Sequence, residues 1–133
     1  MRYPTVAEAL SVAASLLDVV PSVLATDHTV HLLDSALHAP QATFGGEDLV
    51  VGLLEKAATL AFHISRNHPL PDGNKRLAWM MMNVFLELNG HTLERDTARA
   101  ICLMWSVAAS EADVDAIVRV AGQWIQPLDA ALV

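Results

Sequence analysis

The hydrophobic and polar positions of this chain follow the spacing of helices rather than the alternation of strands. Thr5 is followed three residues later by Glu8, which is the spacing of a capping box. A first helix is therefore predicted from Thr5 to about Asp18, and it ends before Pro21. A second, short helix is predicted for residues 28–37.

A loop and a long helix are predicted next. The segment HAPQATFGGED is typical of a loop, because Pro40 and the Gly45-Gly46 pair break regular structure. A long helix is then predicted from about Glu47 to Arg66. Its helical spacing is supplied by Leu49, Leu53, Leu60 and Ile64.

The most apolar helix follows a polar bend. The bend contains Pro69, Pro71 and Gly73, and the next helix is predicted from about Asn74 to Asn89. Its middle, LAWMMMNVFLEL, is apolar almost all round, which is typical of a helix buried in the centre of a bundle. Further helices are predicted for residues 96–109 and from a cap at Ser110 and Asp113 to residue 127.

Composition supports one all-α domain. The chain has 133 residues, 53% of them hydrophobic but only three of them phenylalanine, so alanine, leucine and valine must build the core. Alanine and leucine are strong helix formers. We expect a single domain spanning residues 1–133, folded as a compact bundle of about six helices with a buried central helix after the bend.

Charge and cysteine content narrow the possible functions. The formal net charge of −7 argues against general nucleic-acid binding, which needs a basic surface. No apolar run is long enough for a membrane span, and Glu8 and Asp18 interrupt the N-terminal apolar stretch, so neither a membrane nor a signal peptide is expected. The single cysteine, Cys102, cannot form an internal disulfide. We interpret it as a small core residue and expect a reducing, cytoplasmic location.

The stretch NHPLPDGNKR, residues 67–76, gathers polar chemistry in an otherwise apolar chain. Lys75 and Arg76 lie in the first turn of a helix, where the helix dipole is already positive, so the pair favours an anion site. Gly73 allows close backbone approach to a ligand, and Asp72 is a hard oxygen ligand suited to Mg²⁺. A histidine, here His68, can accept a proton from an attacking hydroxyl. The bland alternative is that Asp72 caps the helix and both bases reach solvent.

This stretch resembles the signature of the Fic/Doc family, H-x-F-x-[DE]-G-N-G-R-x-x-R. The sequence is closer to the Doc (death-on-curing) branch, in which lysine replaces the glycine after the asparagine and the final arginine is absent. Here Lys75 and Trp79 stand at those two positions, and Leu70 replaces the phenylalanine that anchors the loop. Three flanking segments are also similar to Doc proteins: LLDSALHAPQATFGGEDL, EKAATLAFHISRNHP and FLELNGHTL.

The resemblance implies an all-α fold and transfer of part of a nucleotide to a protein hydroxyl. For the Doc branch it implies a toxin that transfers the γ-phosphate of ATP to a serine or threonine of a cytosolic protein, elongation factor Tu, and arrests translation. His68 would be the base and Asp72 the Mg²⁺ ligand. The phosphates would be held by Gly73, Asn74, Lys75 and Arg76. A Phd-like antitoxin is the implied partner.

Two other functions stay open at this point. One is AMP transfer on the same scaffold, as in Fic enzymes, where the hydroxyl attacks the α-phosphate. The other is a catalytically silent interaction domain of the same fold. The inhibitory [ST]-x-x-x-E-[GN] motif of many Fic proteins has no match, since its nearest counterpart, Thr43 to Asp48, ends in aspartate. Inhibition by a partner is therefore expected rather than self-inhibition.

Other polar and aromatic residues are weaker candidates. His28, His31 and His38 could share a helix face and bind a transition metal, but structural or solvent roles are expected because a fourth ligand is not evident. His63 is expected to be partly buried near the bend. Core or interface positions are predicted for Met80, Met81, Met82, Trp79, Trp105 and Trp124.

Overall fold

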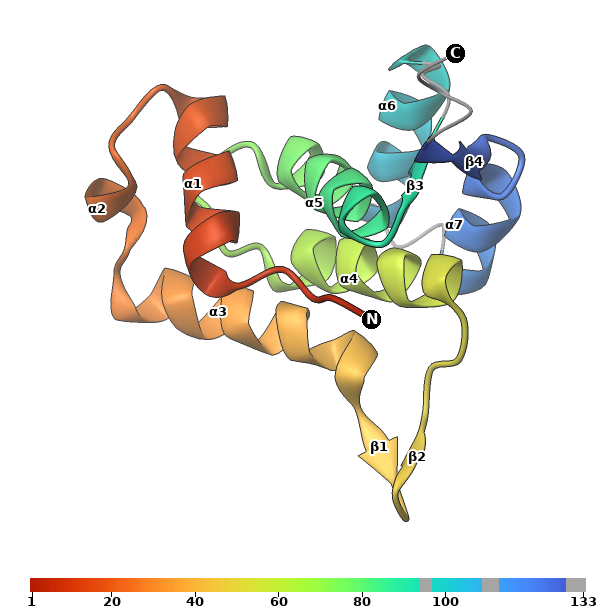
Figure 1. Cartoon of the computed structure of the whole chain (residues 1–133). Coiled ribbons are helices and arrows are strands. Elements are labelled where there is room, and N and C mark those ends of the chain that lie inside the picture. Colours follow the sequence, from red (N-terminus) through yellow and green to blue (C-terminus); the bar gives the residue numbers. More distant parts are fainter. Residues whose placement is uncertain (94–96, 109–112, 129–133) are drawn as a thin grey trace.

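The computed structural model of the chain describes residues 1–93, 97–108 and 113–128. Helices dominate it, together with one short hairpin and a second two-stranded antiparallel sheet whose strands are far apart in the sequence (Figure 1). The helical elements are α1 (Val6–Leu17), α2 (Pro21–Leu24), α3 (Asp27–His38), η1 (Ala39–Gln41), α4 (Leu53–Asn67), α5 (Asn74–Leu88), α6 (Thr97–Ala108) and α7 (Val114–Ala121). The strands are β1 (Thr43–Phe44), β2 (Glu47–Asp48), β3 (His91–Leu93) and β4 (Ile125–Pro127). The prediction of an all-α domain is confirmed in its main feature.

The predicted start of the first helix is confirmed in atomic detail. The Thr5 hydroxyl accepts the backbone N–H of Glu8 at 3.1 Å, and the Glu8 carboxylate accepts the N–H of Thr5 at 3.3 Å. These bonds satisfy donors that the first helical turn leaves unpaired. The C-cap of α1 is Asp18, in the left-handed conformation at φ 54°.

Helices α4 and α5 form the centre of the molecule. They pack along each other, with α1 and α3 on one side and α6 and α7 on the other (Figure 1). The predicted burial of α5 is confirmed for most of its length, since Met81, Met82 and Phe85 are fully buried. Met80, however, is 40% exposed, so the helix keeps one face toward solvent.

The predicted long helix begins later than the pattern indicated. Residues 43–48 form the β1–β2 hairpin, which projects from the end of the bundle (Figure 1). Helix α4 starts only at Leu53, after Gly52 with φ 97°. Leu49, which supplied helical spacing, is 63% exposed and precedes the helix. The prediction from Glu47 was therefore wrong, because the glycine conformation at position 52 sets the boundary.

The C-terminal part also differs from prediction. Strand β3 pairs antiparallel with β4, so Leu93 lies opposite Ile125, and α7 ends at Ala121 rather than near Pro127. Asp113 is the N-cap of α7, whereas Ser110 lies outside the described residues. Cys102 is exposed, so its interpretation as a core residue was wrong.

The structure tests two of the three tryptophan predictions. Trp79 and Trp124 pack edge to face with their ring centroids 6.1 Å apart, which confirms their role as packing anchors. The side chain of Trp105 lies outside the described part of the chain.

No helix within residues 1–93, 97–108 and 113–128 is both long and apolar enough to cross a membrane.

Candidate active site

The polar bend connects the two central helices. His68 is the C-cap of α4 and adopts the left-handed conformation, with φ 55° and ψ 55°. Its backbone N–H still donates to the carbonyl oxygen of Ile64 at 3.2 Å, and its left-handed conformation ends the helix. Left-handed backbone is uncommon for residues other than glycine, so the surrounding contacts must hold His68 in place.

Asn74, the first residue of α5, ties the bend together. Its Oδ1 accepts the N–H of Leu70 at 2.9 Å, and its Nδ2 donates to the carbonyl oxygen of Leu70 at 2.8 Å. The same Nδ2 lies 3.1 Å from Nδ1 of His68. Asn74 is only 5% exposed, and its side-chain amide is hydrogen-bonded within the bend. The predicted role of Asn74 in holding phosphate stays a prediction. Its backbone N–H belongs to the first turn of α5, where N–H groups have no partner within the helix.

Two hydrogen bonds connect helix α3 to the bend. The hydroxyl of Thr29 donates to the carbonyl oxygen of Pro69 at 2.9 Å, and this contact is buried. Nδ2 of Asn67 donates to the carbonyl oxygen of Leu32 at 3.2 Å. The two bonds therefore fix the residues on both sides of His68. Sequence reasoning missed both bonds, because no local pattern links residues so far apart.

Leu70 holds the bend against the core. It is 2% exposed, which confirms the expectation that this leucine anchors the bend in the core. Burial of one large apolar side chain is worth roughly 1.5–3 kcal/mol, so the bend is held by packing as well as by hydrogen bonds.

The N-terminus of α5 has the features of an anion site. Among the described residues no side chain caps this helix, and its first turn contains no acidic residue. Asp72 does not act as the cap, since its Oδ1 accepts the adjacent N–H of Gly73 at 2.8 Å. The first backbone N–H groups of α5 therefore add to the positive end of the helix dipole.

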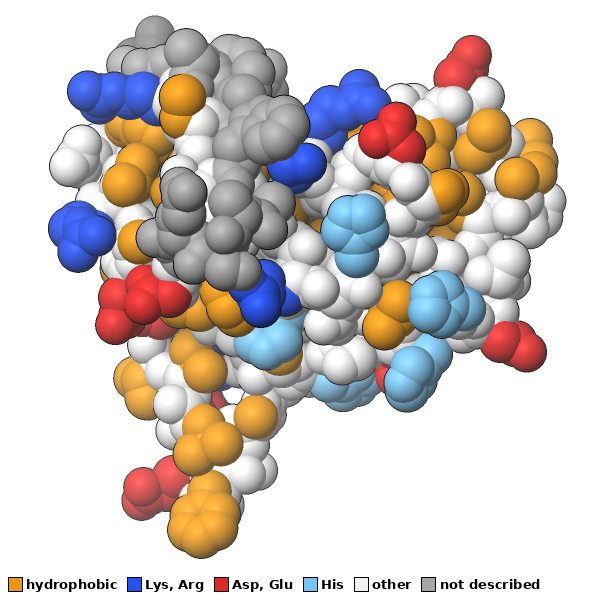
Figure 2. Space-filling model, turned by 180° about the vertical axis from the view of Figure 1, so that it is seen from behind, with side chains coloured by type: hydrophobic (Ala, Val, Ile, Leu, Met, Phe, Trp, Pro, Cys, Tyr) orange, Lys and Arg blue, Asp and Glu red, His pale blue; other side chains and the backbone are white. Residues whose placement is uncertain are grey.

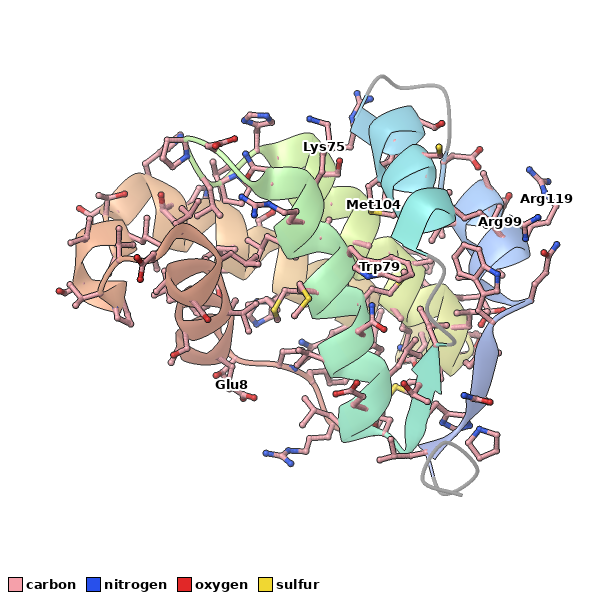
Figure 3. The ribbon with its side chains drawn as sticks, turned by 90° about the horizontal axis from the view of Figure 1, so that it is seen from above. Glu8, Lys75, Trp79, Arg99, Met104 and Arg119 are labelled. Atoms are coloured by element: carbon pink, nitrogen blue, oxygen red, sulfur yellow. The ribbon has the colours of Figure 1, made fainter. Side chains whose placement is uncertain are left out.

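Two cations stand at this helix end. Lys75 is half-buried and extends from the first turn of α5 on the side that faces α6 (Figure 3). Arg76 is exposed, and a Cβ atom placed on Gly73 would lie 3.7 Å from its Nη2. On the back face of the molecule, basic side chains gather beside histidine (Figure 2). The arrangement suits an anion that approaches the backbone of Gly73.

Asp72 is the candidate metal ligand of the bend. The Asp72 carboxylate is exposed, and one of its oxygens is used by the Gly73 N–H. Within the described ranges, no three His, Cys, Asp or Glu side chains are grouped so that they could hold a metal ion. Mg²⁺ is commonly bound by one or two carboxylates together with substrate phosphates, so a single aspartate is compatible with that mode.

Four further histidines lie on helices α3 and α4. His28, His31 and His38 are exposed on α3, and His38 contacts the Asp34 carboxylate at 3.3 Å. His63 is half-buried, as predicted, and its Nδ1 lies 2.9 Å from the carbonyl oxygen of Thr59 within α4.

The described structure also contains a shallow cavity of about 500 Å³ between α6 and α7. Its lining residues are Arg99, Cys102, Leu103, Ser106, Val120 and Gln123. None of the predicted site residues lines it, so the cavity is separate from the bend.

Comparison with known proteins places these features in a family. The sequence model of the Fic/DOC family matches residues 3–86, a range that includes the bend together with α1, α3, α4 and most of α5. Toxin Doc of Mycolicibacterium smegmatis is 47% identical over 88 residues, which cover 65% of this chain and 68% of that protein. The chain belongs to the Fic/DOC family.

Proposed function

We propose that this protein is a toxin that transfers the γ-phosphate of ATP to a serine or threonine hydroxyl of a cytosolic protein. One observation carries the proposal. The bend places the His68 imidazole next to Asn74, the first residue of an uncapped helix whose first turn also carries Lys75 and Arg76. A proton acceptor beside an anion site is the minimal equipment for phosphoryl transfer.

The residues divide the chemistry among them. The hydroxyl oxygen attacks the γ-phosphorus, its proton passes to His68, and the bond from the γ-phosphorus to ADP breaks. The backbone N–H of Asn74 at the start of α5, with Lys75 and Arg76, binds the phosphate oxygens, and Gly73 lets them approach the backbone closely. Asp72 would hold Mg²⁺, which supplies charge neutralisation for the phosphates.

The position of Trp79 favours phosphate transfer over AMP transfer. In the Fic signature this position is an arginine, which grips the triphosphate. Here the Trp79 side chain packs against Trp124 and supplies no cation. Lys75 stands where Fic enzymes have glycine, which changes the charge around the phosphates further. We therefore propose the kinase reaction and treat AMP transfer as its rival.

The biological role is proposed from the named relative. Toxin Doc of Mycolicibacterium smegmatis carries the toxin function in its name. We propose that this chain acts likewise in the cytoplasm, that a Phd-like antitoxin restrains it, and that elongation factor Tu is its target. Arrest of translation would follow from that modification.

An intact-mass measurement tests the proposal. Purified elongation factor Tu is incubated with this protein, ATP and magnesium, and the mass of the factor is recorded. We expect a gain of one phosphoryl group. A gain of one adenylyl group would establish the AMP-transferring rival, and an unchanged mass would reject elongation factor Tu as the target.

A matched variant separates chemistry from folding in this experiment. His68→Asn removes the imidazole, but asparagine tolerates the left-handed backbone that position 68 requires. We expect the variant to fold and to transfer no phosphoryl group. Persistent transfer, or persistent growth arrest in cells, would remove His68 from the role of base.

A further inference from the structure

The hydrogen-bond direction between Asn74 and His68 has a chemical consequence. Oδ1 of Asn74 accepts from the Leu70 N–H, and Nδ2 donates to the Leu70 carbonyl oxygen. A backbone N–H can only donate and a carbonyl oxygen can only accept, so both bonds fix the orientation of the amide. The atom that faces His68 is therefore the amide nitrogen and not the amide oxygen.

This orientation determines which nitrogen of the His68 ring carries the proton. An NH₂ group has two donors, of which one goes to Leu70, so the second faces Nδ1 of His68 at 3.1 Å. Nδ1 must then supply the lone pair. In the neutral ring the single hydrogen therefore lies on Nε2.

The half-buried His63 shows the opposite arrangement within the same protein. Its Nδ1 lies 2.9 Å from the carbonyl oxygen of Thr59, which can only accept. The neutral His63 ring must therefore carry its hydrogen on Nδ1.

We propose that Asn74 is a positioning residue that holds ligand-free His68 as the Nε2–H tautomer. This inference deepens the proposed function, and its consequence for catalysis rests on that function. The resting ring presents an N–H to its surroundings, while the lone pair faces Asn74. Before His68 can take the hydroxyl proton at Nδ1, the ring must turn away from Asn74, and the exposure of His68 leaves room for that movement.

Nitrogen-15 NMR of histidine-labelled protein tests the assignment. The spectrum is recorded without nucleotide, at a pH where a free imidazole is neutral. Signals are assigned with His68→Asn and His63→Gln. We expect the hydrogen on Nε2 of His68 and on Nδ1 of His63. A hydrogen on Nδ1 of His68 would overturn the proposal.

Asn74→Asp makes the test decisive, because a solvated imidazole also populates the Nε2–H form. A carboxylate accepts and cannot donate, so it should move the hydrogen of His68 to Nδ1 while the His63 signal stays unchanged. A His68 ring that keeps the Nε2–H form in this variant would contradict the role of Asn74.

A reciprocal measurement covers the case in which Asn74→Asp does not fold. In His68→Asn, the Asn74 NH₂ proton that faced the ring should shift, while the proton bonded to Leu70 keeps its position. Two unmoved protons would overturn the proposal. Neither measurement contains ATP or a target protein, so failure of the transfer reaction and failure of the tautomer assignment are distinguished.

Discussion

The Thr29 hydroxyl donates a buried 2.9 Å hydrogen bond to the carbonyl oxygen of Pro69, although the two residues are 40 positions apart. The bond joins the first turn of α3 to the residue directly after His68. It therefore connects the stability of the bundle to the geometry of the candidate site.

Thr29→Val should destabilise the protein, because valine keeps the shape of threonine but leaves the Pro69 carbonyl without its donor. An unsatisfied buried acceptor costs about 1–3 kcal/mol in the free energy of unfolding. Thr29→Ser keeps the hydroxyl and should lose less. Urea unfolding of both variants checks this expectation, and equal losses for valine and serine would show that the hydroxyl contributes nothing.

The sequence was sufficient to locate the bend and the buried helix after it. The breakers between residues 69 and 73 and the apolar run through Phe85 are local signals, and local signals determine where a helix begins. The α3 contacts could not be predicted, because Thr29 and Asn67 meet the bend only after the chain has folded. The sequence around a helical threonine does not indicate which distant carbonyl its hydroxyl will bind.

The prediction also failed where two local signals competed. Leu49 has helical spacing relative to Leu53, yet Gly52 at φ 97° separates them and residues 43–48 pair as a hairpin. The spacing of apolar residues contains no information on the backbone φ angle of the glycine between them. The side-chain role of Asn74 was not predicted either. Its amide bonds the backbone of Leu70, and the sequence does not show which backbone groups a side chain will bind.

Gly73→Ala should reduce nucleotide binding, and Gly90→Ala is its matched control. Both glycines have φ 83°, so alanine introduces similar backbone strain of about 1 kcal/mol or more at each. A Cβ on Gly73 would lie 3.3 Å from Cδ2 of Leu17 and near Arg76, whereas a Cβ on Gly90 meets nothing within 4 Å. Calorimetric titration with ATP and magnesium should show weaker binding for Gly73→Ala alone. Equal affinities in both variants would argue against close approach of the nucleotide at Gly73.

Arg76→Ala should weaken nucleotide binding through loss of a charge-assisted contact. Such a contact is worth about 1.5–3 kcal/mol, which corresponds to roughly a 10- to 150-fold rise in Kd. Arg119→Ala is the control, because Arg119 is an exposed arginine on α7, away from the start of α5 where Lys75 lies (Figure 3). We expect unchanged affinity in the control. If titration gives the same Kd for both variants, Arg76 is not a phosphate ligand.

Lys56 gives a pH-dependent prediction about the anchor of the hairpin. Its Nζ is buried, donates to the carbonyl oxygen of Pro40 at 2.9 Å and lies 3.3 Å from Oδ2 of Asp48. Burial acts to lower the pKa of Lys56, but the contacts with Tyr3 and Asp48 outweigh it, so the pKa is raised above its ordinary value.

A raised pKa in the folded state defines the direction of the pH effect. The stabilisation by Lys56 is complete below the unfolded-state pKa of about 10.5, and it is lost as pH rises through the higher folded-state pKa. Lys56→Met should lower the free energy of unfolding at neutral pH by about 1–3 kcal/mol, because the Pro40 carbonyl loses its donor. It should also remove the lysine's part of the alkaline loss of stability. Urea unfolding at neutral and strongly alkaline pH measures both effects.

Asp48→Asn separates the two partners of Lys56. Asp48 is more than half exposed, so solvent screens its ion pair and the pair should contribute only about 0–1 kcal/mol. The buried bond to Pro40 should therefore dominate, and Asp48→Asn should lose much less stability than Lys56→Met. A loss in Asp48→Asn as large as that in Lys56→Met would mean that the ion pair with Asp48, and not the bond to the Pro40 carbonyl, is the main stabilising contact of Lys56.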